Sequence, residues 1–279
     1  MKDITIGQYY PADSVIHKLD PRVKLVGTFA FLFSLFLGKG IASYAVATVF
    51  LAAMVKLSKV PFKMIIKGLK AIIIVLLITV SFNLFLTSGE VIFRLGFLKI
   101  TKEGISVAFF MGLRLIYLVI GASLMTLTTT PNDLTDGLES LLAPLNKIKV
   151  PVHEISMMMS IALRFIPILM EETDRIMKAQ TARGADFESG NLIQKAKAMV
   201  PLLVPLFISA FRRANDLAMA MEARCYRGGD GRTKMKPLKY EKRDHNAYVI
   251  LGLYLVLMIG SAWLVQVLLG IILGTMMAV

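Results

Sequence analysis

Two long helical patterns end in the same kind of tripeptide, a small residue followed by an arginine. A planar guanidinium can take a carboxylate through two parallel hydrogen bonds, and a cation also complements the negative end of a helix dipole. One such end would be an ordinary helix cap. Two of them, 41 residues apart on matched helices, predict a two-pronged docking element for a two-lobed partner. The tripeptides are Ala182-Arg183-Gly184 and Ala223-Arg224-Cys225.

No motif in the sequence has the spacing that catalysis or metal binding needs. Gly38-Lys39-Gly40 lacks the rest of a phosphate-binding loop, and His153-Glu154 has no second histidine four residues on. His17 and His245 are equally isolated, and no Ser/His/Asp set is recognisable. We therefore predict that the protein is not an enzyme, that it lacks a nucleotide site, and that it binds no metal or cofactor directly. If it does energised work, the nucleotide chemistry must take place on a partner.

The composition is that of an integral membrane protein. Hydrophobic residues make up 56% of the 279 residues, charged residues make up 18%, and the mean hydropathy is +0.67. Soluble domains average about 25% charged residues. The net charge of +13 fits topology signals and anionic lipid, and no nucleic-acid-binding module is recognisable. The lipid bilayer is therefore an expected partner and nucleic acid is not.

Apolar runs and charge breaks predict an all-α chain with about five transmembrane helices. Lysines at 56, 59, 63, 67 and 70 mark an amphipathic surface segment before the third span. Residues 88–103 fit a hairpin or a lip, and residues 131–145 fit an amphipathic helix. The five predicted spans are 23–37, 41–55, 71–86, 104–128 and 247–276.

The region between the fourth and fifth spans holds the two long helices. At about 1.5 Å per residue, each could reach roughly 45 Å. Pro167 in the first helix, and Pro201 and Pro205 in the second, predict bends. Seventeen methionines in the chain suit a surface that repacks against changing partners, and they suit core filling equally well. We divide the chain into residues 1–128 (four spans), 129–246 (the long helices) and 247–279 (the final span).

Charge asymmetry predicts the orientation. With the N-terminus in the cytoplasm, 27 of the 32 Lys and Arg residues lie inside and four lie outside. This obeys the positive-inside rule, which the opposite orientation violates. The remaining cation, Arg114, lies within a span, where it either serves function or simply faces other helices. The long helices are accordingly expected on, or partly sunk into, the cytoplasmic side of the cell membrane.

Three stretches of the chain resemble a known family. Gly7-Gln8-Tyr9-Tyr10 with Ser14, and the run His17 to Leu25, are similar to the N-terminal signature of the transmembrane T component of energy-coupling factor (ECF) vitamin transporters. This family includes the cobalt-transport permease component. The two tripeptides resemble its Ala-Arg-Gly coupling motifs, with the run Ala223 to Gly229 as the second. Cys225 departs from the glycine of that motif.

The resemblance implies a mainly helical scaffold that joins two ATP-binding-cassette (ABC) ATPase subunits to one or more membrane substrate-binding subunits. It implies that Arg183 and Arg224 dock in grooves of the two ATPases, which hold the ATP, and that ATPase closure moves the helices and drives vitamin release inward. Two other functions stay open. A secondary transporter would need an acidic ion-coupling residue in a span, and a membrane enzyme would need an acid or histidine cluster at the surface. We find neither in the sequence.

Overall fold

The structure is a computed structural model, and its contacts divide the chain into two compact units. Unit 1 comprises Met1–Leu138 and Leu238–Val279, and unit 2 comprises Glu139–Pro237. Helices dominate both units, so the all-α class predicted from the sequence is confirmed. The structure describes residues 9–38, 40–95, 98–187, 191–229 and 235–277. Gly7 and Gln8 of the N-terminal signature lie outside these ranges.

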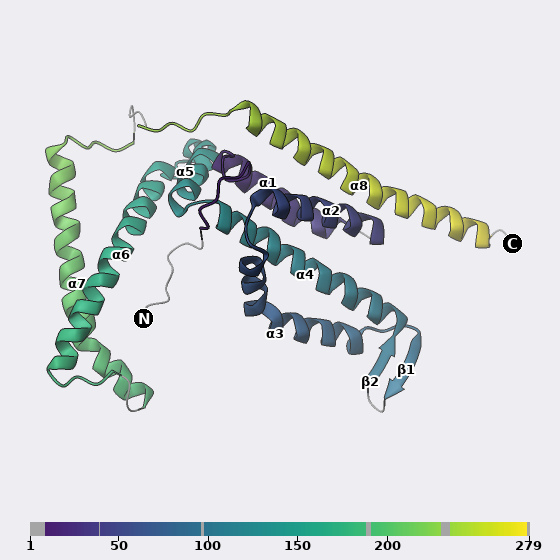
Figure 1. The fold of residues 1–279 in the computed structure, drawn as a ribbon, viewed down its shortest axis with the longest axis horizontal. Helices are drawn as coiled ribbons and strands as arrows, with labels where there is room; N and C mark the ends of the chain where they lie inside the picture. The colour runs from purple at the N-terminus through teal and green to yellow at the C-terminus, as the bar shows by residue number, and fades with distance from the viewer. Residues whose placement is uncertain (1–8, 39, 96–97, 188–190, 230–234, 278–279) are drawn as a thin grey trace. The chain divides into compact units, whose positions relative to one another are not determined.

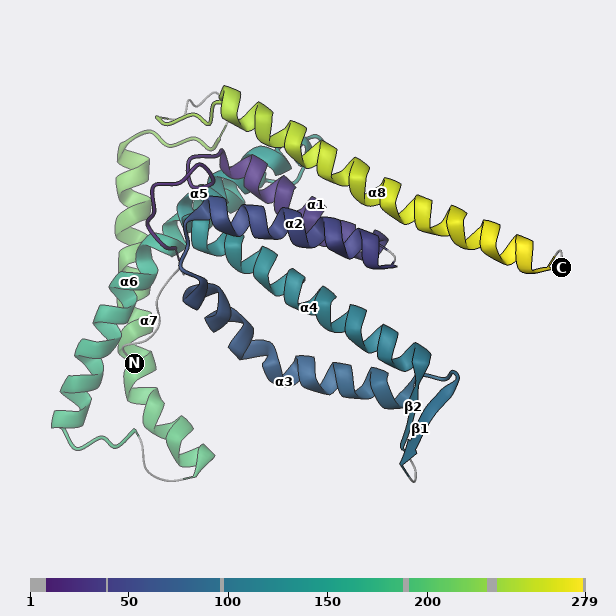
Figure 2. The ribbon, with the colours of Figure 1, turned by 45° about the vertical axis from the view of Figure 1, so that its right-hand side comes forward.

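Unit 1 is a layer of long helices with a small hairpin at one end. Within its described residues, α1, α2, α4 and α8 pack side by side, and α3 runs along α4 (Figures 1 and 2). The hairpin joins α3 to α4. The elements are α1 (Pro21–Leu37), α2 (Gly40–Ser58), α3 (Phe62–Leu86), β1 (Val91–Leu95), β2 (Leu98–Thr101), α4 (Lys102–Thr128) and α8 (Lys242–Met277).

The core of unit 1 lies where α1, α2, α4 and α8 meet. Aromatic rings form its centre: Phe50 stacks on Tyr254 with ring centroids 4.2 Å apart, and Phe31 lies within 6.0 Å of both. Such offset aromatic contacts add to the burial of apolar area. The core links segments more than 200 residues apart in sequence. Its buried members are Phe31, Leu35, Tyr44, Ala47, Leu51, Tyr117, Leu251, Tyr254 and Met258.

The start of α1 is capped as the sequence predicts, and it is also tied to the start of α8. The Asp20 carboxylate accepts from the backbone N–H of Arg22 at 2.9 Å, with Pro21 in the first turn. Burial alone would raise the pKa of Asp20, but hydrogen bonds from Arg22 outweigh it and lower that pKa. Asp244, 2% exposed, accepts from the backbone N–H of Asp20 and of Glu241, each at 2.8 Å.

The N-terminal signature residues hold the segment before α1 against the end of α4. The His17 ring pairs with the Ser14 hydroxyl at 2.7 Å and with the Tyr10 carbonyl at 2.9 Å. Burial lowers the pKa of His17, which favours the neutral ring. The Lys24 ammonium donates to the carbonyls of His17 and Thr128, each at 2.9 Å. The signature therefore has a structural role in unit 1.

The segment after α2 follows the predicted division between surface helix and span. α3 is continuous but bends by 61° between its Phe62–Lys70 and Ile72–Leu86 parts (Figure 2). The lysine-rich part is thus set off from the apolar part. The hairpin predicted over residues 88–103 is confirmed as antiparallel β1 and β2, with Val91 opposite Thr101.

Five helices are long and apolar enough to cross a membrane, but their membership differs from the prediction. They are α2, α4, α8, and the two long helices of unit 2; the bent α3 makes a possible sixth. This assignment rests on helix length and composition alone and covers only the residues that the structure describes. α1 has 17 residues, about 26 Å, which is short for a hydrocarbon core of about 30 Å. The sequence prediction instead makes α1 a span and places the unit 2 helices on, or partly sunk into, the cytoplasmic side of the membrane.

The amphipathic helix predicted over residues 131–145 is shorter in the structure. α5 (Pro131–Leu142) ends three residues early, and the 3₁₀ helix η1 (Ala143–Ile148) follows it. Pro144 has no N–H to donate to the carbonyl of Ser140, and this lost hydrogen bond disfavours continuation of the α-helix. α5 begins in unit 1 and ends in unit 2.

Candidate functional site

The candidate site is built on two long antiparallel helices in unit 2. They are α6 (Val152–Ala182) and α7 (Leu192–Ala223), with 31 and 32 residues. The Gln180 amide lies 3.5 Å from the Pro201 carbonyl, and an ion pair joins Glu172 to Arg213 at 3.8 Å. From Gln180 back to Glu172 on α6, the partner on α7 moves forward from Pro201 to Arg213, so the helices run in opposite directions. Figures 1 and 2 show them crossing, with a bend in α7.

The end of α6 is closed by a Schellman motif around the first tripeptide. Ala182 is the last helical residue and Arg183 is the C-cap. The N–H of Gly184 donates to the Thr181 carbonyl at 2.9 Å, and the N–H of Ala185 donates to the Gln180 carbonyl at 3.0 Å. Gly184 takes the left-handed conformation that this motif requires, with φ +89°.

The end of α7 has the same geometry around the second tripeptide. Arg224 is the C-cap after Ala223. The N–H of Cys225 donates to the Glu222 carbonyl at 2.8 Å, and the N–H of Tyr226 donates to the Met221 carbonyl at 3.0 Å. Cys225 holds the left-handed position with φ +56°. The cysteine thus adopts the conformation that Gly184 adopts on α6, although a side chain there costs about 1–2 kcal/mol.

All six residues of the two tripeptides are exposed. No ion-pair partner of the Arg183 or Arg224 guanidinium is found among the residues that the structure describes. Since a C-cap residue projects beyond the last turn, each guanidinium can reach a surface outside its own helix. The structure therefore offers two free cationic helix ends with matching backbone geometry.

The two helix ends are not adjacent. Because α6 and α7 are antiparallel, Arg183 and Arg224 lie at opposite ends of the helix pair (Figures 1 and 2). The chain after α7 returns to the start of α6: a Cβ on Gly229 would lie 2.4 Å from the His153 ring. The arrangement fits two separate docking sites better than a pair of prongs that enter one partner side by side.

Large apolar side chains remain exposed along both helices. On α6 they include Met158, 58% exposed, and on α7 Phe207 and Phe211, 61% and 69% exposed. Exposed apolar surface on this scale marks contact with another protein or with lipid. The set is Ile155, Met158, Met159, Ile166, Ile193, Met199, Val200, Leu203, Val204, Phe207, Ile208, Phe211 and Met219. We call these residues the apolar face of unit 2.

Arg114 contacts neighbouring helices of unit 1. Its Nε donates to the Tyr44 hydroxyl at 3.0 Å, and its guanidinium lies 5.2 Å from the centre of the Phe36 ring. These contacts agree with the simpler of the two sequence interpretations, in which Arg114 faces other helices. Sequence reasoning could not name Tyr44 as the partner, because 70 residues separate the two.

The histidines do not come together. His17 belongs to the N-terminal network of unit 1, and the His153 ring pairs with Glu139 at 3.0 Å in unit 2. Glu139 also accepts from the Ser156 hydroxyl at 3.0 Å. His245 is exposed near the start of α8. Within the described ranges, no group of three or more His, Cys, Asp or Glu side chains could hold a metal ion.

Comparisons with known proteins give a consistent result. A family model described as "Cobalt transport protein" matches residues 12–235. The "Energy-coupling factor transporter transmembrane protein EcfT" of Clostridium kluyveri is 61% identical over 88% of this chain and 91% of its own length. The proteins of the same name from Thermosediminibacter oceani and Bacillus subtilis are 56% and 50% identical, over 91% and 90% of this chain and 96% and 95% of their own lengths. The chain therefore belongs to the CbiQ/EcfT family, the transmembrane components of ECF transporters.

Proposed function

We propose that this chain couples two ABC-type ATPase subunits to one or more membrane substrate-binding subunits in an ECF importer for vitamins or other micronutrients. Arg183 and Arg224 dock the two ATPases, and the apolar face of unit 2 contacts the substrate-binding subunit. ATP binds to the partner subunits and not to this chain.

One observation carries the proposal most directly. The structure presents two exposed arginines on helix ends with the same Schellman geometry, at opposite ends of one antiparallel pair. Each guanidinium offers five donors in a rigid fork that matches a carboxylate. Two equivalent docking points at opposite ends of the helix pair suit two separate ATPase subunits. Motion of the two ATPases would then act on both ends of the helix pair.

The apolar face of unit 2 supplies the second half of a coupling device. α6 and α7 contain stretches apolar enough to enter a membrane, and the same helices end in exposed cations. Docking at the cationic ends and contact with a membrane protein along the apolar face place both partners on the same two helices. The methionines in this face tolerate repacking during movement.

Charge supports the proposed orientation. The chain carries 18 Lys and Arg residues between positions 131 and 246, the region that contains unit 2. Positive residues favour the cytoplasmic side, where ATP is available to the partner ATPases. We therefore place the N-terminus and the tips of α6 and α7 in the cytoplasm, in a multi-pass protein of the cell membrane.

Affinity purification from the native cell tests the proposal. The tagged chain, extracted in mild detergent, should bring with it two different ATPase subunits and one or more small hydrophobic proteins. The number of small proteins decides whether the chain serves several substrate-binding subunits or one. A chain that purifies alone and moves a solute in liposomes without ATP would instead be a secondary transporter.

A further inference from the structure

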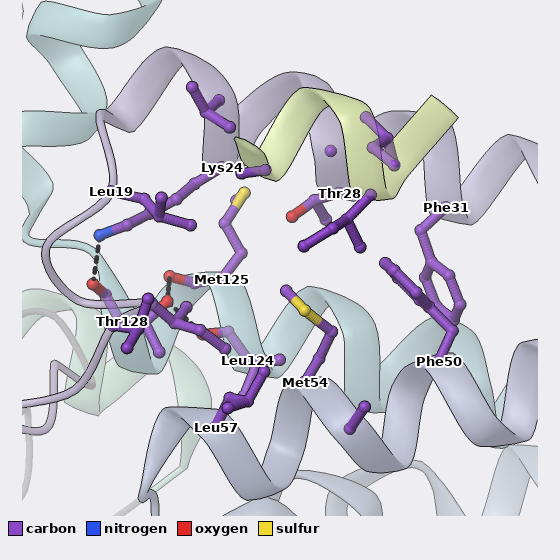
Figure 3. Close-up of a pocket in the computed structure, with 18 of the residues that line it drawn as sticks. Leu19, Lys24, Thr28, Phe31, Phe50, Met54, Leu57, Leu124, Met125 and Thr128 are labelled. Atoms are coloured by element: carbon purple, nitrogen blue, oxygen red, sulfur yellow. Dashed lines mark hydrogen bonds between the residues drawn. The ribbon is translucent and has the colours of Figure 1, made fainter. Parts of the chain in front are cut away.

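Unit 1 contains a partly open cavity of about 390 Å³ between the segment before α1 and helices α1, α2, α4 and α8 (Figure 3). It lies at the end of the layer where α1 and α8 begin and where α2 and α4 end. Its volume falls in the range of about 300–1,000 Å³ that is typical of small-molecule sites. The function proposed above does not use this cavity.

The body of the cavity is apolar. Figure 3 shows Phe31, Phe50, Met54, Leu124 and Met125 around it. The Lys24 ammonium reaches its edge but already donates to two backbone carbonyls, and the Thr128 hydroxyl donates to the Leu124 carbonyl. Ordered water needs two to four polar partners, so the lining favours a hydrocarbon occupant.

One side of the cavity is open to apolar surroundings. Val15, Leu57 and Ile250 border it, and they are 59%, 51% and 57% exposed. In a membrane protein such exposed apolar side chains are suited to contact with lipid. A hydrocarbon chain can therefore enter the cavity sideways from the bilayer without crossing a polar barrier.

The border of the cavity also carries a cation with unused hydrogen-bonding capacity. Arg243 lies in the first turn of α8, where the positive end of the helix dipole adds to its charge. Its Nη2 pairs with Glu241 at 2.6 Å. Its Nε is buried and has no hydrogen-bond partner among the described residues. The Arg243 side chain is 39% exposed, so an anionic oxygen can approach the outer N–H groups of its guanidinium.

We propose that this cavity binds one acyl chain of an anionic phospholipid, with the lipid phosphate held by Arg243. The apolar body accommodates the chain, the open side admits it, and the arginine with the α8 N-terminus selects the headgroup charge. This lipid site is independent of the ATPase-docking arginines, because it lies in unit 1 and they lie in unit 2.

Photo-crosslinking in nanodiscs tests the site with the full chain. The probe is phosphatidylglycerol with a diazirine on one acyl chain, and adducts are mapped by mass spectrometry. We expect adducts to concentrate on residues 50–57 and 121–128. A matched phosphatidylcholine probe should label these segments about fivefold less, the ratio that one cation near the headgroup supports. Uniform labelling of all lipid-facing helices would overturn the proposal.

Two variants with matched controls sharpen the test. A Cβ on Gly27 meets nothing within 4 Å, and Gly27 lines the cavity, so Gly27→Leu should fill it and abolish the concentrated adducts. Gly252→Leu adds the same side chain at another unobstructed glycine, outside the cavity lining, and should leave them.

The headgroup is tested in the same way. Arg243→Gln should remove the preference for phosphatidylglycerol, whereas Lys239→Gln, at an exposed lysine outside the lining, should keep it. Unchanged adducts in Gly27→Leu would overturn the acyl-chain site, and an unchanged headgroup preference in Arg243→Gln would overturn the role of the arginine. The adduct map of the unmodified chain decides the case even if a variant folds poorly.

Discussion

Replacement of both Arg183 and Arg224 by alanine abolishes transport in reconstituted liposomes. Loss of one partner from a buried interfacial charge pair costs about 2–5 kcal/mol, which weakens binding about 30-fold or more for each arginine. In the proposed function the two ends dock separate partners, so the double variant should lose both ATPases. The measurement is ATP-dependent substrate uptake, together with the amount of ATPase that co-purifies. The substrate-binding subunit should stay bound, since the apolar face of unit 2 is intact.

A second double variant tests whether the loss of positive charge alone, away from the helix tips, affects uptake. Arg175 and Arg212 are exposed cations on the same two helices, away from the tips. Their joint replacement by alanine removes the same charge and should leave uptake close to that of the unmodified chain. Lysine at positions 183 and 224 keeps the charge without the bidentate fork and should give intermediate uptake. Normal uptake by the tip variant would show that the two arginines are ordinary helix caps.

Asp244→Ala destabilises unit 1 by about 3 kcal/mol, because the backbone N–H groups of Asp20 and Glu241 lose their common buried acceptor. The apparent unfolding temperature in detergent should fall by about 6–12 °C. Asp244→Asn keeps the size but leaves one acceptor oxygen, so its decrease should be smaller. Asp13, whose side chain is 80% exposed in its ion pair with Lys18, is the control. Asp13→Ala should leave the unfolding temperature unchanged, and an equal fall in both alanine variants would contradict the role of Asp244.

The elements that depend on local sequence were predictable. The ends of both long helices at Ala182 and Ala223 could be predicted because they depend on local sequence. A Schellman motif involves only six consecutive residues, and each tripeptide lies within one such motif. The cap of α1 is equally local, since Asp20, Pro21 and Arg22 are neighbours. The sequence alone shows that Cys225 stands where the Ala-Arg-Gly motif has glycine. The left-handed backbone of Cys225 could not be predicted, because non-glycine residues enter that conformation only where the surrounding structure requires it.

The features that sequence reasoning missed are those made by distant contacts. Asp244 bonds Asp20 across 224 residues, and nothing local distinguishes Asp244 from a helix-start carboxylate. The antiparallel direction of α6 and α7 places Arg183 and Arg224 at opposite ends of the helix pair, which their spacing in the sequence does not show. The cavity in unit 1 depends on the positions of four helices and of the turn before α1. Composition also does not decide which helices span the membrane. α6 and α7 are apolar enough to cross it, but they also carry charged residues that favour the aqueous side.

Distance measurement between the two helices tests the coupling claim most directly. Spin labels at Lys178→Cys on α6 and Ala220→Cys on α7, both exposed, are introduced in a Cys225→Ser background, since Cys225 is the single native cysteine. Arg164→Cys with Lys178→Cys, both on α6, gives the fixed reference. In the assembled transporter, an ATP analogue should shorten the α6–α7 distance and leave the reference unchanged. Identical α6–α7 distances with and without nucleotide, in a complex that transports, would contradict the account.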